Sequence, residues 1–264
     1  MAITTWDGFI GSAKQPQFMA KTASRTAVAA NWFSVFDLAG NPGAGTLAGT
    51  STTTGVVPTD ATAGCPTINA FGASATGYLA QVDFGSSVAC RLKLFDLLWK
   101  GGAFAFNASV SGSSPASFSS RVAGGTDYTD TQIWLEQVTA GTGIQNVNVT
   151  YTNQAGTTGR STGTVATAAN IVGRMWQLPL QAGDTGVQGV TGVVGTVATA
   201  GTFNILVLRP LWSGRCRTAN DGDVHDLAKT GMPIIYADSA LFLAVAADST
   251  ATGIPELELV IANG

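Results

Sequence analysis

The sequence predicts an all-β fold, either a sandwich or a barrel. Short segments whose side chains alternate between apolar and polar recur along the chain, which is the period of a half-buried strand. Glycine, the residue best suited to tight reversals, supplies 33 of 264 residues, nearly double the usual share of about 7%. Charged residues make up only 11%, against about 25% in an average globular protein, so the chain is rich in turns and poor in charge.

The first 64 residues are expected to lie outside the main domain. Residues 1–21 show no sustained period and carry Pro16 between two glutamines, which predicts an extended arm. Residues 22–38 are expected to form a short helix that stops at Gly40, with one side made of Val28, Trp32, Val35 and Ala39. A Gly/Thr-rich linker follows as far as residue 64, so we divide the chain into an arm, helix and linker over 1–64 and a β domain over 65–264.

Strands recur at short intervals through the β domain, and one helix interrupts them. The helix is predicted over 224–229, capped by Asp221 or Asp223 and ended by Gly231. The segment 92–99 is ambiguous between strand and helix. The other segments are predicted strands: 77–84, 103–110, 132–139, 146–152, 161–167, 174–180, 187–197, 202–209, 234–247 in two pieces, and 256–262.

Charge and cysteine usage exclude several classes of protein. The net charge of −3 leaves no positive excess to hold nucleic acid or an anionic membrane. No apolar run approaches the ~18 residues of a membrane-spanning helix, and the first fifteen residues lack a secretory signal. The three cysteines are dispersed and form no CxxC, which predicts free thiols made in a reducing cytosol and no zinc site.

Few residues offer catalytic chemistry. Asp184-Thr185-Gly186 matches an aspartic protease triplet but lies between predicted strands, where Asp-x-Gly is ordinary turn chemistry. The single histidine, His225, lies in an acidic cluster over 220–226 whose spacing does not match an EF-hand loop. A glycosidase pair would have to come from Asp127, Asp130 and Glu136, and Arg209, Arg215 and Arg217 suggest a small salt-bridge network. We therefore expect no enzyme activity, no cofactor and no metal.

Four phrases spread along the chain resemble a family of tailed-bacteriophage virion proteins. They are WFSVF at 32–36 with GNPGAG at 40–45, TYTNQAG at 150–156 with Gly159 and Arg160, and LPLQAGDTG at 178–186. The resemblance implies a jelly-roll-like β-sandwich that serves as a particle component. It implies a head decoration or cement protein, made in the host cytoplasm, that sits on the capsid surface of the virion.

The expected partners follow from that resemblance. They are the major capsid protein and the chain itself, as a homo-oligomer that we expect to be a trimer. The arm is expected to reach a neighbouring subunit through Trp6, Phe9, Gln15, Pro16 and Phe18. Two alternatives remain open: a glycan- or receptor-binding module of a phage fibre, neck or tail, marked by exposed Trp and Tyr on a concave face, and a particle-bound glycan hydrolase, which needs two facing carboxylates.

Overall fold

The computed structural model describes residues 3, 5–72, 75–107, 109–111, 115–167, 171–196 and 200–264. Strands account for 52% of it and helices for 5%, and the strands pair antiparallel. The predicted all-β class is therefore confirmed. No helix among the described residues is long and apolar enough to cross a membrane.

The elements follow one another from a short amino-terminal helix to a carboxy-terminal strand. In order they are α1 (Trp6–Gly11), β1 (Ala13–Lys21), β2 (Trp32–Ser34), β3 (Gly40–Asn41), β4 (Ser51–Val56), β5 (Gly77–Ser86), β6 (Cys90–Ala105), β7 (Ser109–Ser111), η1 (Ser119–Arg121), β8 (Gln132–Thr139), β9 (Gln145–Asn153), β10 (Arg160–Ser161), β11 (Val165–Thr167), β12 (Arg174–Leu178), β13 (Val187–Gly195), β14 (Thr202–Cys216), β15 (Asp221–His225), α2 (Leu227–Thr230), β16 (Ile234–Ile235), β17 (Leu241–Ala247) and β18 (Pro255–Asn263).

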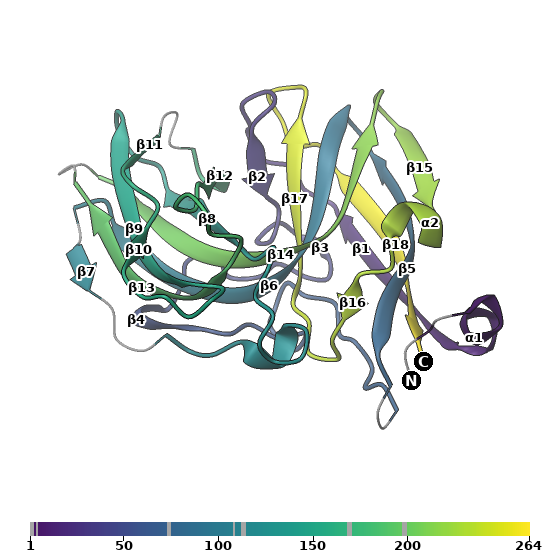
Figure 1. The fold of residues 1–264 in the computed structure, drawn as a ribbon. Coiled ribbons are helices and arrows are strands. Elements are labelled where there is room, and N and C mark those ends of the chain that lie inside the picture. The colour runs from purple at the N-terminus through teal and green to yellow at the C-terminus, as the bar shows by residue number, and fades with distance from the viewer. Residues whose placement is uncertain are drawn as a thin grey trace.

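These strands form three sheets (Figure 1). The terminal sheet has the order β15-β5-β18-β1-β3, with β16 also on β5. The distal sheet has the order β10-β9-β13-β7, with β11 on β9. The central sheet runs β14-β8-β12-β2-β17-β6-β4, and a further pairing of β14 with β6 closes six of its strands into a ring. The terminal and distal sheets lie on either side of this ring.

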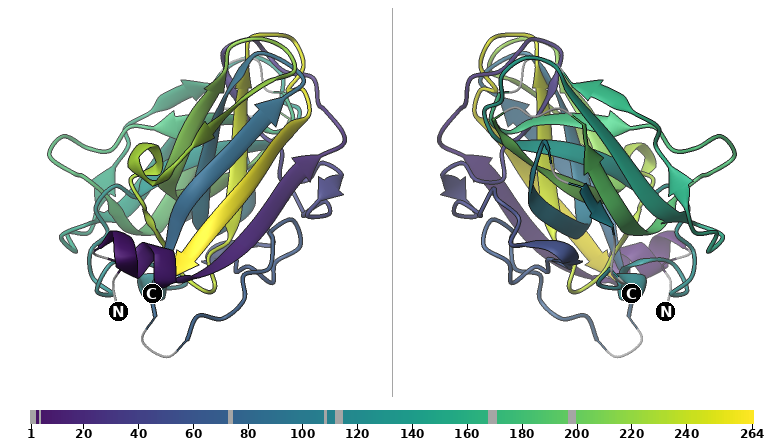
Figure 2. Two further views of the ribbon diagram at one scale, coloured as in Figure 1. Left: turned by 90° about the vertical axis from the view of Figure 1, so that its right-hand side faces the viewer. Right: turned by 90° about the vertical axis from the view of Figure 1, so that its left-hand side faces the viewer.

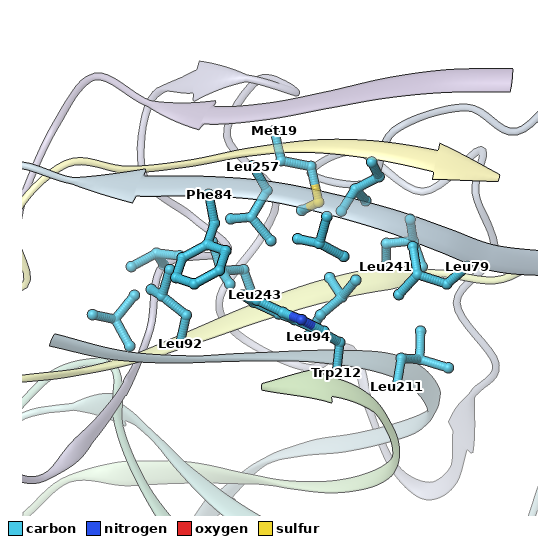
Figure 3. Packing of buried hydrophobic residues seen from close by; sticks show 14 of the residues in the cluster. Met19, Leu79, Phe84, Leu92, Leu94, Leu211, Trp212, Leu241, Leu243 and Leu257 are labelled. Carbon is cyan, nitrogen blue, oxygen red and sulfur yellow. The ribbon is translucent and has the colours of Figure 1, made fainter. Parts of the chain in front are cut away.

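Three apolar clusters hold the layers together, and β6 contributes to all of them. Leu92 and Leu94 face the cluster beneath the terminal sheet, which also contains Met19 and Phe84 (Figure 3). Further along the same strand, Phe95 and Leu97 lie in the cluster that takes side chains from six strands of the ring. The next residues, Leu98 and Trp99, join the cluster shared with the distal sheet. Each of these β6 side chains is at most 2% exposed, so this one long strand ties the layers into a single packed body.

Most strand predictions are confirmed. The segments 132–139, 77–84, 146–152 and 256–262 coincide with β8 or fall within β5, β9 and β18. The ambiguous segment 92–99 is a strand, within β6. The predicted strand 161–167 divides into the end of β10 and β11, and the predicted strand 103–110 spans the end of β6 and part of β7. Residues 108 and 197, which two of the predicted strands include, lie outside the described residues.

The helix predicted over 22–38 is wrong. This stretch contains β2, which pairs with β12 and β17, and Phe33 within it is fully buried. Trp32 and Phe33 are aromatic residues, which favour strands, and a short apolar run satisfies helix and strand periods equally well. The second helix is also displaced: residues 221–225 form β15, and Asp226 caps α2 by accepting from the amides of Ala228 and Lys229. Gly231 ends it as predicted, in the left-handed conformation with φ 68°.

The extended arm expected over 1–21 is instead a short helix followed by an integral strand. β1 pairs with β18 from Ala13↔Asn263 to Ala20↔Glu256, and Met19 is 2% exposed in the core beneath the terminal sheet. The linker contributes β4, which pairs with β6. Strands from the first 64 residues therefore share sheets with strands from 65–264.

Candidate interaction surface

The amino-terminal helix α1 exposes its apolar side chains. Thr5 caps it by accepting from the Gly8 amide at 3.1 Å, and Lys14 Nζ donates to the Phe9 carbonyl at 2.8 Å at its other end. None of its six residues is buried, and Trp6 is 66% and Ile10 70% exposed. Water contacts most of the area of these two side chains, so α1 adds apolar surface to the outside of the molecule.

A small apolar hollow lies between α1 and the segment around α2. Its volume is about 260 Å³, and its lining includes Ile3, Trp6, Phe9, Leu227 and Met232. The rings of Trp6 and Phe9 meet edge to face, with centroids 6.2 Å apart. Figure 1 shows α1 projecting at the edge of the molecule, away from the ring. The helix therefore presents an aromatic edge beside a hollow that a partner's apolar side chain can enter.

The five residues predicted to contact a neighbour do not lie on one surface. Trp6 and Phe9 lie together on α1. Gln15 is occupied internally, because its amide donates to the Asn69 carbonyl at 2.9 Å and accepts from the Asn69 amide at 3.0 Å. Pro16 and Phe18 are exposed and alternate with buried Met19 along β1, so they lie on the outer face of the terminal sheet. Two of the five thus belong to α1 and two to a second surface.

That second surface, the acidic face, is the outer side of the terminal sheet. The left view of Figure 2 shows β5, β18 and β1 there with no layer over them. The pairing registers set Phe18, Glu258, Asp83 and Val224 in one row across four strands. A groove of about 620 Å³ on this face is lined by Phe18, Ile254, Asp83, Asp221, Glu256 and Glu258, among others, and by no lysine or arginine.

A third surface, the basic groove, lies over the end of the ring where β6 and β14 carry cations. Its volume is about 440 Å³, and its charged and aromatic lining is Trp32, Arg91, Lys93, Arg215, Arg217, Asp223 and His225. Lys93 Nζ lies 5.0 Å from the centroid of the Trp32 ring and 5.6 Å from that of Trp134. Partial burial lowers the pKa of Lys93.

Sequence reasoning found only part of the basic groove. It grouped Arg209, Arg215 and Arg217, yet Arg209 binds the buried carboxylate of Asp96 at 3.0 Å instead. It missed Arg91 and Lys93, which line the groove because β6 pairs with β14. The alternation of charged Arg91 and Lys93 with buried Leu92 and Leu94 was the available signal for an exposed face of this strand.

The residues considered as catalytic candidates in the sequence form hydrogen bonds that hold the fold together. Asp184 accepts from Arg160 Nε at 2.8 Å, from Tyr151 at 2.7 Å and from Asn153 at 2.7 Å. The Arg160 bond, supported by the other two, lowers the pKa of Asp184 to about 2. This carboxylate ties the turn after β12 to β9 and β10, which agrees with the prediction that the triplet is a turn.

The other candidates behave similarly. His225 Nδ1 accepts from the Trp212 indole at 2.9 Å, and its ring packs on Phe84 with centroids 5.0 Å apart. Within the described ranges, no group of three or more His, Cys, Asp or Glu side chains is placed to hold a metal ion. Glu136 is fully buried and accepts from Asn204 at 2.7 Å, whereas Asp127 and Asp130 are exposed.

Comparison with known proteins adds little to this geometry. No protein-family model matches the chain, and no curated protein matches it. Among solved structures, the D431N mutant VP2 protein of infectious bursal disease virus, in derived T=1 particles, aligns over 96% of this chain and 77% of that one, at 9% identity and a TM-score of 0.14. A score this low carries no argument about fold or function.

Proposed function

We propose that this chain is a non-enzymatic structural protein of a bacteriophage particle, a decoration or cement protein that docks on the shell of major capsid protein. The observation that carries the proposal is α1, a helix without a single buried residue that presents Trp6 and Ile10 to solvent. The resemblance of the sequence to tailed-phage virion proteins supplies the identity of the partner. In this role the protein resides on the virion surface and needs no cofactor.

The mechanism is linkage between docking and assembly. A large aromatic side chain beside an apolar hollow is the typical centre of a binding interface, where a few residues carry most of the affinity. Each copy that binds the assembled shell, and not free capsid subunits, stabilises only the assembled state. Repetition over a symmetric shell adds many such contacts, so the head withstands heat and internal pressure without any catalysis.

Binding of purified protein to assembled capsids tests the proposal. Truncating a central interface residue costs about 2 kcal/mol or more, which corresponds to a roughly 30-fold weaker Kd, so we expect at least this loss for Trp6→Ala. Ile144→Ala is the matched control, because Ile144 is also an exposed apolar residue, at 63%, but lies between β8 and β9. Equal affinity for assembled and free capsid protein, or unchanged binding of W6A, would refute the proposal.

A glycan- or receptor-binding role at a fibre, neck or tail is the second candidate, and Trp32 favours it. This partly exposed ring lines the basic groove beside Lys93, and an aromatic ring exposed in a concave surface is the feature expected of a glycan-binding module. Particles that lack the protein distinguish the two roles. Release of DNA at lower temperature supports decoration, whereas normal heat stability with poor adsorption to host cells or glycans supports the receptor role.

A further inference from the structure

Two surfaces of this molecule carry opposite charge in concentrated form. The acidic face has four carboxylates and no cation among its lining residues. The basic groove has four cations, with Asp223 as its only carboxylate. The whole chain has thirteen cationic and sixteen anionic side chains. Charges of both signs are therefore separated onto different surfaces instead of being mixed.

Each surface also places like charges directly opposite one another. On the acidic face Glu258 of β18 pairs in register with Asp83 of β5. In the basic groove Arg215 of β14 pairs in register with Arg91 of β6. Residues opposite one another in an antiparallel pair have Cβ atoms only about 5 Å apart, so like charges there repel and destabilise the isolated sheet. Opposite charge brought by a partner would relieve both repulsions.

Contacts within the chain leave most of this charge uncompensated. Asp83, Glu256 and Glu258 form no ion pair with any residue that the structure describes. The same holds for Arg91 and Lys93. Arg215 lies 3.7 Å from Asp248, but both side chains are well exposed, and exposed pairs of this kind contribute little.

We propose that the acidic face of one copy docks in the basic groove of another copy. The partner at each surface is a second copy of this chain, because the acidic face and the basic groove carry opposite charge. Apolar side chains line both surfaces as well. Phe18 and Ile254 line the acidic groove with the carboxylates, and Trp32 lines the basic groove with the cations, so contact between the two surfaces would bury apolar area as well as pair opposite charges.

The two surfaces are separate, so the contact is head to tail. The two grooves share no lining residue, and along β15 Asp221 and Gly222 line the acidic groove whereas Asp223 and His225 line the basic one. A head-to-tail contact forms a closed ring when the rotation between copies completes a full turn. Three copies in a ring give the trimer expected of this protein, and each copy then uses both surfaces.

Charge reversal tests the contact without any capsid. In 50 mM NaCl we expect the wild-type protein to sediment at three times the 26.8 kDa of one chain. In 1 M NaCl, where the Debye length falls to about 3 Å, we expect it to sediment as a monomer. Glu256→Lys with Glu258→Lys should lower association at least tenfold, and so should Arg91→Glu with Arg215→Glu. Thr52→Lys with Thr53→Lys, on exposed positions of β4, adds positive charge elsewhere and should leave association within twofold.

Mixing the two reversed proteins provides the decisive measurement. Each is expected to be monomeric alone, yet the mixture should associate with the two proteins alternating. The lysines of one then meet the glutamates of the other, and the unaltered groove of the first meets the unaltered acidic face of the second. All four substitutions in one chain should also restore self-association, because the reversed acidic face then meets a reversed basic groove. Any of three results would overturn the inference: the wild-type protein is monomeric, the substitutions do not change its association, or the mixture stays monomeric. The inference rests on the proposed function. None of these substitutions changes α1, so a failure of this test would not refute capsid docking through Trp6, which the capsid-binding experiment tests separately.

Discussion

Replacing Asp96 by asparagine should cost this fold more stability than any surface change. Asp96 lies on β6 with no exposed area, and its two carboxylate oxygens accept four hydrogen bonds. Arg121 and the Ala240 amide donate to one oxygen, each at 3.0 Å. Arg209 at 3.0 Å and the Ser239 hydroxyl at 2.9 Å donate to the other. The side chain thus holds η1, β14 and the segment before β17 against β6.

The expected loss of unfolding free energy follows from the burial of Arg121, the ion-pair partner of Asp96. The Arg121 side chain is fully buried, so D96N leaves a guanidinium without its counter-ion and turns one acceptor into an amide donor that faces donors. Breaking a buried ion pair from one side costs about 3–5 kcal/mol. At about 2–4 °C for each kcal/mol in a chain of this size, Tm should fall by roughly 6–20 °C.

Urea and thermal denaturation followed by circular dichroism measure this loss. Asp130→Asn is the matched control, because Asp130 is an exposed aspartate that lies outside the acidic face, and the free energy of unfolding of this variant should change by no more than about 0.5 kcal/mol. A double-mutant cycle with Arg121→Met should show strong coupling to D96N. A loss below about 1 kcal/mol for D96N, or purely additive effects in the cycle, would refute the reasoning.

Three further outcomes are expected. Deleting residues 1–11 should leave the far-ultraviolet dichroism and Tm nearly unchanged, since no α1 residue is buried. Deleting residues 1–21 also removes β1 and should unfold the protein. A folded 1–21 deletion variant would contradict the pairing of β1 with β18. Asp184→Asn should lower the free energy of unfolding at pH 7, and this deficit should disappear between about pH 4 and pH 2. The sign follows because the folded-state pKa of about 2 lies below the ordinary value of 3.8, so the contribution is present above 3.8 and lost as the pH falls; a deficit that persists at pH 2 would contradict it. Ellman's reagent at pH 8 should modify the native protein slowly and reach three thiols only in denaturant, since burial raises the pKa of Cys65 to about 12 and the other two are fully buried; rapid native labelling would contradict this.

The predicted contact residues show where sequence reasoning about the site stopped. Lack of periodicity marked residues 1–21 as a candidate contact region, and Trp6, Pro16 and Phe18 are indeed exposed. The same reasoning mistook β1 for an arm, because a strand of mixed Gln, Pro, Phe and Met shows no clear period of two. Only its pairing with β18 reveals that Gln15 and Met19 face inward.

The sequence by itself determined the all-β class, the position of β8 to the residue and the turn around Asp184. These features are local, since the alternation of side chains and the turn chemistry of Asp and Gly act over a few residues. The tertiary structure alone decided which strands meet. Arg91 faces Arg215, and Phe18 lies beside Glu258, because packing of apolar residues far apart in the chain fixes the sheet registers. A local pattern shows which side chains point outward, but only long-range pairing determines which of them share a surface.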